Sequence, residues 1–263
     1  MKSDYLRKEA ELYINFIAQG ESVESNKFMT KTLKEINQGS LFLNDWVYDQ
    51  TKELMKKGKL VGLLGGDHST PFGYFKAMAD VYPDFGILQI DAHCDLRIAY
   101  EGFEYSHASI MYNALEKIPA LKKLIQVGIR DYCEEELDYI NNSNGRVITY
   151  FDRNIKHRLY EGDSWKIVVD EIVSHLPQHV FVSFDIDGLD PKLCPHTGTP
   201  VQGGFETEQI FYLLNKVHQS GKKIIGFDLN EVGVSHDEWD ENVGARVLYK
   251  LCNLLTMSNP VNG

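Results

Sequence analysis

The spacing of hydrophobic and polar positions changes near Gly58, and this change divides the chain into two parts. Before Gly58, apolar residues recur every three or four positions, the period of amphipathic helices. Three helices are predicted there: one over residues 5–18, one from a cap at Ser25 to about Gln38 with Gly39 beyond it, and one from a cap at Asn44 or Asp45 to Lys57. We expect these helices to serve packing rather than chemistry.

After Gly58, short continuous apolar runs alternate with helical patterns. The runs expected to form strands are Leu60–Leu64, Gly86–Ile90, Lys123–Ile129, Arg146–Phe151, Val180–Phe184 and Lys223–Asp228. Continuous apolar strands are typical of burial on both faces, so the alternation predicts an α/β fold: an open parallel sheet sandwiched by helices in three layers. We expect one domain over residues 1–263, with a helical part at 1–58 and a sheet core at 59–263.

The net charge and composition of the chain indicate which kinds of partner it can bind. The 263 residues carry a formal charge of −11 with no basic run, which argues against nucleic acid or an anionic membrane as a partner. An acidic field favours cationic substrates and metal ions instead. No apolar stretch approaches the roughly 20 residues that span a bilayer, and the four cysteines lack paired spacing. The start of the chain lacks the apolar core of a secretory signal, so a cytoplasmic location is expected.

Residues that could bind a metal or act in catalysis follow the ends of three predicted strands. The first end carries His68 after two glycines, the second reads Asp91-Ala92-His93-Cys94-Asp95, and the third reads Asp185-Ile186-Asp187. In an extended chain, residues two apart face the same side, so the acids and imidazoles of each end are expected to point together. Taken alone, His68 is explained nearly as well as a surface residue on a loop.

Together the three ends supply two imidazoles and four carboxylates, a set too large for one ion and suitable for two. Four carboxylates balance two divalent cations, and a mixed oxygen and nitrogen set without thiolates favours Mn²⁺, with Fe, Co, Ni and Zn open. Two metals about 3.5–4 Å apart can share a water and generate hydroxide near neutral pH. The set therefore predicts hydrolysis by metal-activated water.

The segments 65–69, 91–95 and 183–191 resemble the three signatures of the ureohydrolase (arginase/agmatinase) family in order and spacing, and the similarity runs from about Leu60 to the C-terminus. The resemblance implies two manganese ions per chain and a hydroxide between them that attacks a guanidinium carbon, giving urea and an amine. It also implies the ligands: His68 and Asp95 on one ion, His93 and Asp187 on the other, and Asp91 and Asp185 bridging both.

The resemblance extends to His107 and Glu231, which with Asp95 make up the implied catalytic residues. Glu231, in the segment 226–232, matches the acid that pairs with the substrate guanidinium, and a carboxylate can accept two parallel N–H bonds from that planar group. His107, in the segment 105–108, resembles a mobile histidine suited to protonating the leaving amine. An exposed loop glutamate and a surface histidine are the alternative interpretations.

The implied substrate is a small cationic guanidino compound. The short run between Asp95 and His107, and the segment 198–204, are more similar to microbial agmatinases than to arginases, which favours hydrolysis of agmatine to putrescine and urea. Arg97 leaves open a carboxylate-bearing substrate, such as guanidinobutyrate or formimidoylglutamate, or else a role as partner of a nearby acid. Arginase activity, a deacetylase-like reaction and an inactive family member are further alternatives.

The N-terminal part departs from the family pattern. Family members begin with a strand and a Gly/Pro-rich loop, and no counterpart precedes Leu60. Either the sequence is truncated or the sheet has lost its first strand, and in both cases the sheet is expected to lack its usual N-terminal strand. A homo-oligomer, trimeric or hexameric, is expected from the resemblance.

Overall fold

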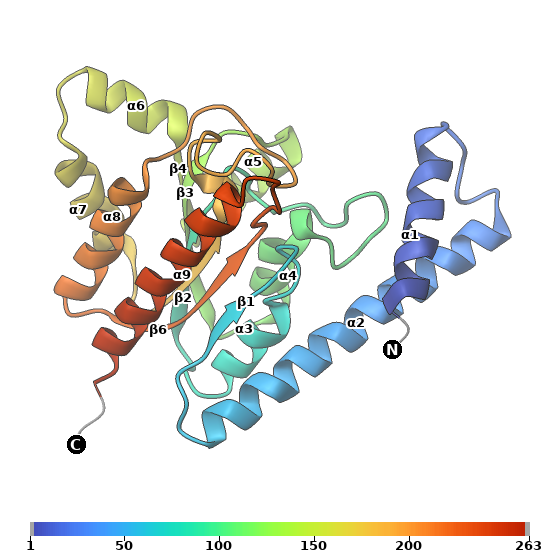
Figure 1. Ribbon diagram of the computed structural model, residues 1–263, viewed down its shortest axis with the longest axis horizontal. Coiled ribbons are helices and arrows are strands. Elements are labelled where there is room, and N and C mark those ends of the chain that lie inside the picture. Colours follow the sequence, from blue (N-terminus) through green and yellow to red (C-terminus); the bar gives the residue numbers. More distant parts are fainter. Residues whose placement is uncertain (1–2, 261–263) are drawn as a thin grey trace.

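The computed structural model describes residues 3–260, in which a six-stranded sheet carries helices on both faces (Figure 1). The strands are β1 (Gly62–Leu64), β2 (Phe85–Ile90), β3 (Leu121–Ile129), β4 (Val147–Phe151), β5 (His179–Asp185) and β6 (Lys223–Asn230). The helices are α1 (Ser3–Ala18), α2 (Lys27–Lys56), α3 (Phe72–Ala79), α4 (Ile110–Lys117), α5 (Glu134–Asn142), α6 (Asp152–Tyr160), α7 (Trp165–His175), α8 (Thr207–Gln219) and α9 (Trp239–Ser258). Every predicted strand is present, with its bounds shifted by at most two residues.

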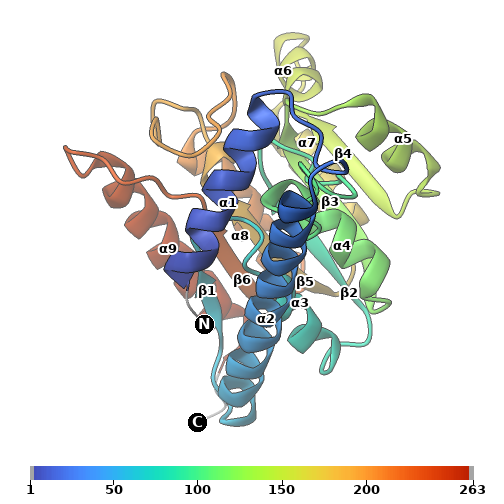
Figure 2. The ribbon, with the colours of Figure 1, turned by 90° about the vertical axis from the view of Figure 1, so that its right-hand side faces the viewer.

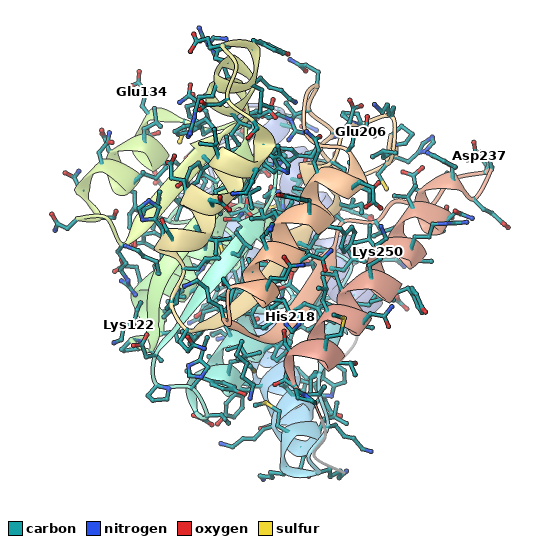
Figure 3. All side chains as sticks on the ribbon, turned by 90° about the vertical axis from the view of Figure 1, so that its left-hand side faces the viewer. Lys122, Glu134, Glu206, His218, Asp237 and Lys250 are labelled. Atoms are coloured by element: carbon teal, nitrogen blue, oxygen red, sulfur yellow. The ribbon has the colours of Figure 1, made fainter. Side chains whose placement is uncertain are left out.

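The sheet has the order β1-β6-β5-β2-β3-β4, and every pair of neighbours is parallel. Successive residues of the central strands face opposite hydrophobic cores, as the period of a strand requires. Ile87 belongs to the core under α3 and α4, whereas Leu88 belongs to the core under α7, α8 and α9. Figure 3 shows the second of these faces, with Lys250 on α9. The predicted three-layer α/β fold is thus confirmed.

The prediction of two separate helices between residues 25 and 57 is wrong, because α2 runs unbroken from Lys27 to Lys56. Its N-cap is Asn26, whose side chain accepts hydrogen bonds from the backbone of Phe28 and Met29, rather than Ser25. Gly39 does not end the helix. A Cβ there would lie 2.5 Å from Leu6 Cδ1, so this glycine is the point where α1 crosses α2 closely. Close packing thus outweighs the unfavourable helix propensity of glycine, about 1 kcal/mol.

Helices α1 and α2 form an antiparallel hairpin that extends beyond the sheet (Figures 1 and 2). The C-terminal half of α2 packs on α3, where the backbone of Asn44 lies so close to Gly73 that a Cβ on Gly73 would clash. No strand precedes β1 within the described residues 3–61, in agreement with the sequence. Within the described residues, no helix is both long and apolar enough to cross a membrane.

Candidate metal centre

The predicted site residues meet at one edge of the sheet. Because all six strands are parallel, their carboxyl ends share an edge, and β5 lies between β6 and β2. Ile90 pairs with Phe184 in the ladder, which places Asp91 beside Asp185. Loop 65–71 follows β1 and brings His68 over the same ends. Gly65 is needed there, because a Cβ at this position would clash with the Asn230 side chain at the end of β6.

A first group of donor atoms surrounds the ring of His68, which is 1% exposed. Its Nδ1 lies 3.1 Å from Asp91 Oδ2, 3.1 Å from Asp95 Oδ2 and 3.3 Å from Asp185 Oδ2. Donor atoms of His68, Asp91 and Asp185 all lie within 4.8 Å of one another. Three buried carboxylates facing one imidazole nitrogen make an arrangement suited to a divalent cation.

A second group shares Asp91 with the first. Its members are Asp91, His93 and Asp187, whose donor atoms again lie within 4.8 Å of one another. His93 Nδ1 is 3.0 Å from Asp187 Oδ2 and 3.5 Å from Asp91 Oδ1. Asp91 therefore turns one carboxylate oxygen to each group. Asp185 belongs only to the first group.

Turns, rather than the extended backbone expected from the sequence, bring these side chains together. Asp187 lies in a 3₁₀ turn, Ile186–Gly188, and Asp95 has a left-handed backbone with φ of 56°. Neither residue is part of an extended strand. Instead, Asp185 Oδ1 accepts from the backbone N–H of Asp187 at 2.9 Å, and Asp91 Oδ1 accepts from that of His93 at 2.6 Å. Two such Asx turns direct the side chains to one point.

Burial and neighbouring charges shift the pKa values of the residues in the two groups. Burial lowers the pKa of His93, but Asp187 and Asp91 outweigh this effect and raise it to about 12. The pKa of His68 is also held well above its ordinary value, because Asp185, Asp91 and Asp95 offset its burial. Burial, together with the charge of Asp91, raises the pKa of Asp95 to about 7. The carboxylate edge thus draws positive charge strongly.

Orphaned polar atoms show that these residues fit a metal. His68 Nδ1 and Asp187 Oδ2 are buried and have no hydrogen-bond partner in the described chain. Buried polar atoms are almost always paired, because an unpaired one costs roughly 1–3 kcal/mol. Each orphan belongs to one of the two donor groups, so coordination of a cation would satisfy both.

The side chain of Ser183 determines which nitrogen of His68 is free for a metal. Ser183 Oγ donates to Asp228 Oδ1 at 3.0 Å, and it lies 2.9 Å from His68 Nε2. Since the only hydroxyl hydrogen is used by Asp228, His68 Nε2 must be the donor to Ser183. The lone pair of the neutral ring is then on Nδ1, the atom that faces the three carboxylates.

Changing Ser183 to alanine is expected to weaken metal binding in the His68 group by about 10–100-fold, the usual cost of losing an outer partner of a ligating histidine. The His93 group should keep its affinity. Metal titration of the purified protein by calorimetry measures both sites. Ser174→Ala is the matched control, because its hydroxyl donates only to the backbone of its own helix. Equal weakening of both sites, or of neither, would contradict the proposed role.

Several residues that support the site were not predicted from the sequence. Gln89 Nε2 donates to Asp91 Oδ2 at 2.8 Å, and Gln126 Nε2 donates to Gln89 Oε1 at 2.8 Å; all three residues are fully buried. Glutamines inside otherwise apolar strands were the signal that could have revealed them. Arg130 donates to the backbone oxygens of Asp187, at 2.6 Å, and Val201. It thereby joins the turn after β5 to loop 198–204.

A cavity of about 250 Å³ opens beside the two donor groups. Its lining combines site residues with aromatic and polar ones: His93, Asp95, Arg97, Tyr100, His107, Ala108, Asp131, Tyr132, Glu136, Thr199, Pro200 and Val201. A larger cavity, of about 770 Å³, lies elsewhere, between the end of α2 and β1. The smaller one is the candidate substrate site, because His93 of the second donor group and Asp95 line it.

The structure brings His107 and Glu231 to the same region. His107 lines the cavity, and its Nδ1 lies 3.4 Å from Asp67 Oδ2, whose hydrogen bond raises the pKa of His107. Glu231 has a left-handed backbone with φ of 61°, and its Oε1 accepts from the backbone N–H of His68 at 2.9 Å. Burial and the nearby Asp67 raise the pKa of Glu231. A non-glycine residue with positive φ carries strain that is common at functional sites.

The chain is thus a parallel α/β protein with two carboxylate–imidazole groups, each able to hold a metal ion, at the carboxyl edge of its sheet. The family model named Arginase family matches residues 9–253. The chain belongs to this family, which confirms the resemblance seen in the sequence.

Similar proteins carry related names. An N(1)-aminopropylagmatine ureohydrolase of Thermus thermophilus is 35% identical over 201 residues, which cover 76% of this chain and 64% of that protein. The match therefore spans slightly less than two thirds of the length of that relative. An agmatinase of Bacillus subtilis is 30% identical, covering 79% of this chain and 68% of its own. The crystal structure of agmatine ureohydrolase of Thermoplasma volcanium aligns with a TM-score of 0.66 at 26% identity, covering 83% of this chain and 69% of that one.

Proposed function

We propose that this protein is a hydrolase with two metal ions that cleaves a guanidino compound, with agmatine, converted to putrescine and urea, as the favoured substrate. The observation that carries the proposal is the position of Asp91, which turns Oδ2 to the His68 group and Oδ1 to the His93 group. A carboxylate shared between two donor groups is what a pair of metals requires. Family membership and the names of the relatives support the reaction class.

The proposed ions are Mn²⁺, two per chain, because the donors are carboxylates and imidazoles without thiolate. When bound, a pair of divalent metals supplies a nucleophilic water at neutral pH and stabilises developing negative charge. His68, Asp95 and Asp185 would hold one ion and His93 and Asp187 the other, with Asp91 shared between them. The family resemblance implies that Asp185 would be shared as well.

Glu231 and His107 would bind and protonate the substrate. The backbone of His68 holds one carboxylate oxygen of Glu231, and the other lies 3.3 Å from the place of a Cβ on Gly198, at the edge of the site. From there Glu231 can accept N–H bonds from a guanidinium and fix its plane. His107 lies across the cavity beside Asp67, which favours its protonated form and so suits it to give a proton to the leaving amine.

Charge in the cavity favours a substrate with a cationic tail. Arg97, the candidate carboxylate clamp, has its Nε 3.6 Å from Oε2 of Glu136, a buried acid, so its charge is largely compensated. Asp131 also lines the cavity, and its side chain is 67% exposed. Its Oδ2 lies 3.9 Å from His93 Nε2, and most of the side chain faces solvent at the opening. An exposed carboxylate there suits an ammonium group and disfavours guanidinobutyrate and formimidoylglutamate.

A urea-release assay with Mn²⁺ tests the proposal. Agmatine, N(1)-aminopropylagmatine, arginine and guanidinobutyrate are supplied in parallel, and the amine product is identified by chromatography. Urea and putrescine from agmatine are expected. Formamide from formimidoylglutamate, or an acid from an acylated amine, would instead assign a related C–N hydrolase. Full metal loading with no turnover of any of these compounds would contradict an enzymatic role.

Self-association and a cytoplasmic location are further parts of the proposal. The expected assembly, a trimer or hexamer, rests on the family resemblance, whereas the cytoplasmic location rests on the four cysteines without paired spacing. Light scattering of the purified protein at micromolar concentration measures the mass directly, and a monomer of 30.1 kDa would contradict this part of the proposal.

A further inference from the structure

The loop between β2 and α4 contacts both the candidate substrate cavity and the N-terminal hairpin. Arg97 N donates to Ala108 O at 2.9 Å, so the loop closes on itself at its base. Its tip is a tight turn in which the backbones of Tyr100 and Phe103 pair, with distances of 2.8 and 3.2 Å. Glu101 and Gly102 at the centre have φ of 53° and 85°, the conformation of a type I′ turn. In Figure 1 this loop reaches from the sheet toward α1.

On one side, the turn presents Tyr100 to the cavity. The ring of Tyr100 lines the opening, and its centroid lies 5.9 Å from that of His107. Tyr132 lines the same cavity. Aromatic faces attract cations within about 6 Å, so the position of Tyr100 affects how the tail of a cationic substrate is bound.

On the other side, the turn is held by the α1–α2 hairpin. Asn37 on α2 donates from Nδ2 to Gly102 O at 3.1 Å, and its Oδ1 accepts from Glu104 N at 3.0 Å. Tyr13 on α1 donates from its hydroxyl to Glu101 O at 3.0 Å. A single asparagine thus binds the backbone at the centre of the turn and directly after it.

Apolar packing supports the same contact. The rings of Tyr13 and Phe103 lie 5.3 Å apart, and Phe103 packs against the small core of the hairpin formed by Tyr13, Met29 and Ile36. Gly102 fits closely, because a Cβ there would lie 2.9 Å from Leu33 Cδ2. The turn is therefore part of the packing of the hairpin.

We propose that Asn37 is a positioning residue: from the N-terminal hairpin, it holds the turn 100–103 so that Tyr100 forms one wall of the substrate cavity and sets selectivity for the substrate tail. The inference rests on the proposed function, because it assumes that the cavity receives a guanidino substrate. It gives the hairpin, expected from sequence to serve packing alone, a part in substrate recognition. Asn37 acts through Tyr100, without contact to the reacting atoms.

The test compares Asn37→Ala with Gln38→Ala, its exposed neighbour on the same helix, in the full chain loaded with Mn²⁺. In Asn37→Ala we expect KM for agmatine to rise about tenfold with kcat changed less than about twofold, because two hydrogen bonds that position the turn are lost. The preference for agmatine over guanidinobutyrate should fall by a similar factor. Gln38→Ala should match the wild type in all three values.

Hydrogen exchange makes the test independent of turnover. The Glu104 amide donates to Asn37, so its exchange should become at least about tenfold faster in Asn37→Ala, with metal content unchanged. If the wild type releases no urea, this result still shows that Asn37 holds the loop, while the proposed function fails. Wild-type exchange and unchanged selectivity in Asn37→Ala would overturn the inference.

A second variant covers the case in which Asn37→Ala does not fold. Tyr13→Phe keeps the ring packing against Phe103 and removes only the hydrogen bond to Glu101 O. It should change KM and selectivity in the same direction by a smaller factor, about two- to fivefold. No change in KM, selectivity or exchange at residues 100–104 in this variant would overturn the inference equally.

Discussion

Asp91→Ala is expected to bind neither metal ion tightly and to lose about a thousandfold or more in kcat. Among the described residues, Asp91 alone is present in both donor groups, so its removal takes one oxygen from each. A bound metal is worth several kcal/mol of transition-state stabilisation, and each 1.36 kcal/mol is a factor of ten. Metal content by elemental analysis and urea release at saturating agmatine measure the two effects.

Comparison with Asp187→Ala makes the test specific. Asp187 belongs to the His93 group alone, so its alanine variant should lose one ion and retain the other. Asp138→Ala, at an exposed position on α5, is the control for loss of a negative charge. If Asp91→Ala kept two ions, or lost no more metal than Asp187→Ala, Asp91 would not be shared between two metals.

The fold could largely be predicted from the sequence because its signals are local. Short runs such as Val180–Phe184 are buried on both faces, and their continuous apolar composition indicates this burial without any knowledge of distant contacts. The error in α2 has a non-local cause. Gly39 is a stop signal in sequence, but its neighbour in space is Leu6, and that contact cannot be inferred from a stretch of residues around position 39.

The candidate ligands could be identified from the sequence, whereas the residues that orient them could not. His68, Asp91 and Asp187 stand in compact motifs at strand ends. Their partners come from distant positions: Ser183 meets His68 across 115 residues, and Asp187 O meets Arg130 across 57. Sequence spacing does not encode such contacts, which depend on strand order and on the path of loops.

Strained backbone explains why motif and geometry differ. The i, i+2 spacing predicted that the acids lie close together, and they do. That prediction assumed an extended backbone, however, and the backbone at Asp95 is left-handed instead. Asp95 reaches the site through a left-handed backbone, and Glu231 does the same after β6. This conformation is unfavourable for non-glycine residues by about 1–3 kcal/mol, and propensity therefore argues against it. It persists where surrounding contacts fix it, such as the bond from Glu231 N to Gly66 O at 2.7 Å.

Glu231→Gln is expected to keep both metal ions, raise KM for agmatine and lower kcat, with kcat/KM reduced by about a hundredfold or more. The amide oxygen of glutamine can still accept from His68 N, so the loop should stay in place. The lost element is the negative charge that faces the guanidinium. Removing one partner of a desolvated charge pair costs about 2–5 kcal/mol, which accounts for the expected loss.

Steady-state kinetics with metal analysis in the same preparations decide the role of Glu231. Glu161→Gln, at an exposed position after α6, is the matched control and should behave as the wild type. Loss of metal in Glu231→Gln would show that this residue supports His68 rather than the substrate. Unchanged KM and kcat would show that Glu231 does not bind the substrate, because loss of a charged guanidinium partner would have to change at least one of the two constants.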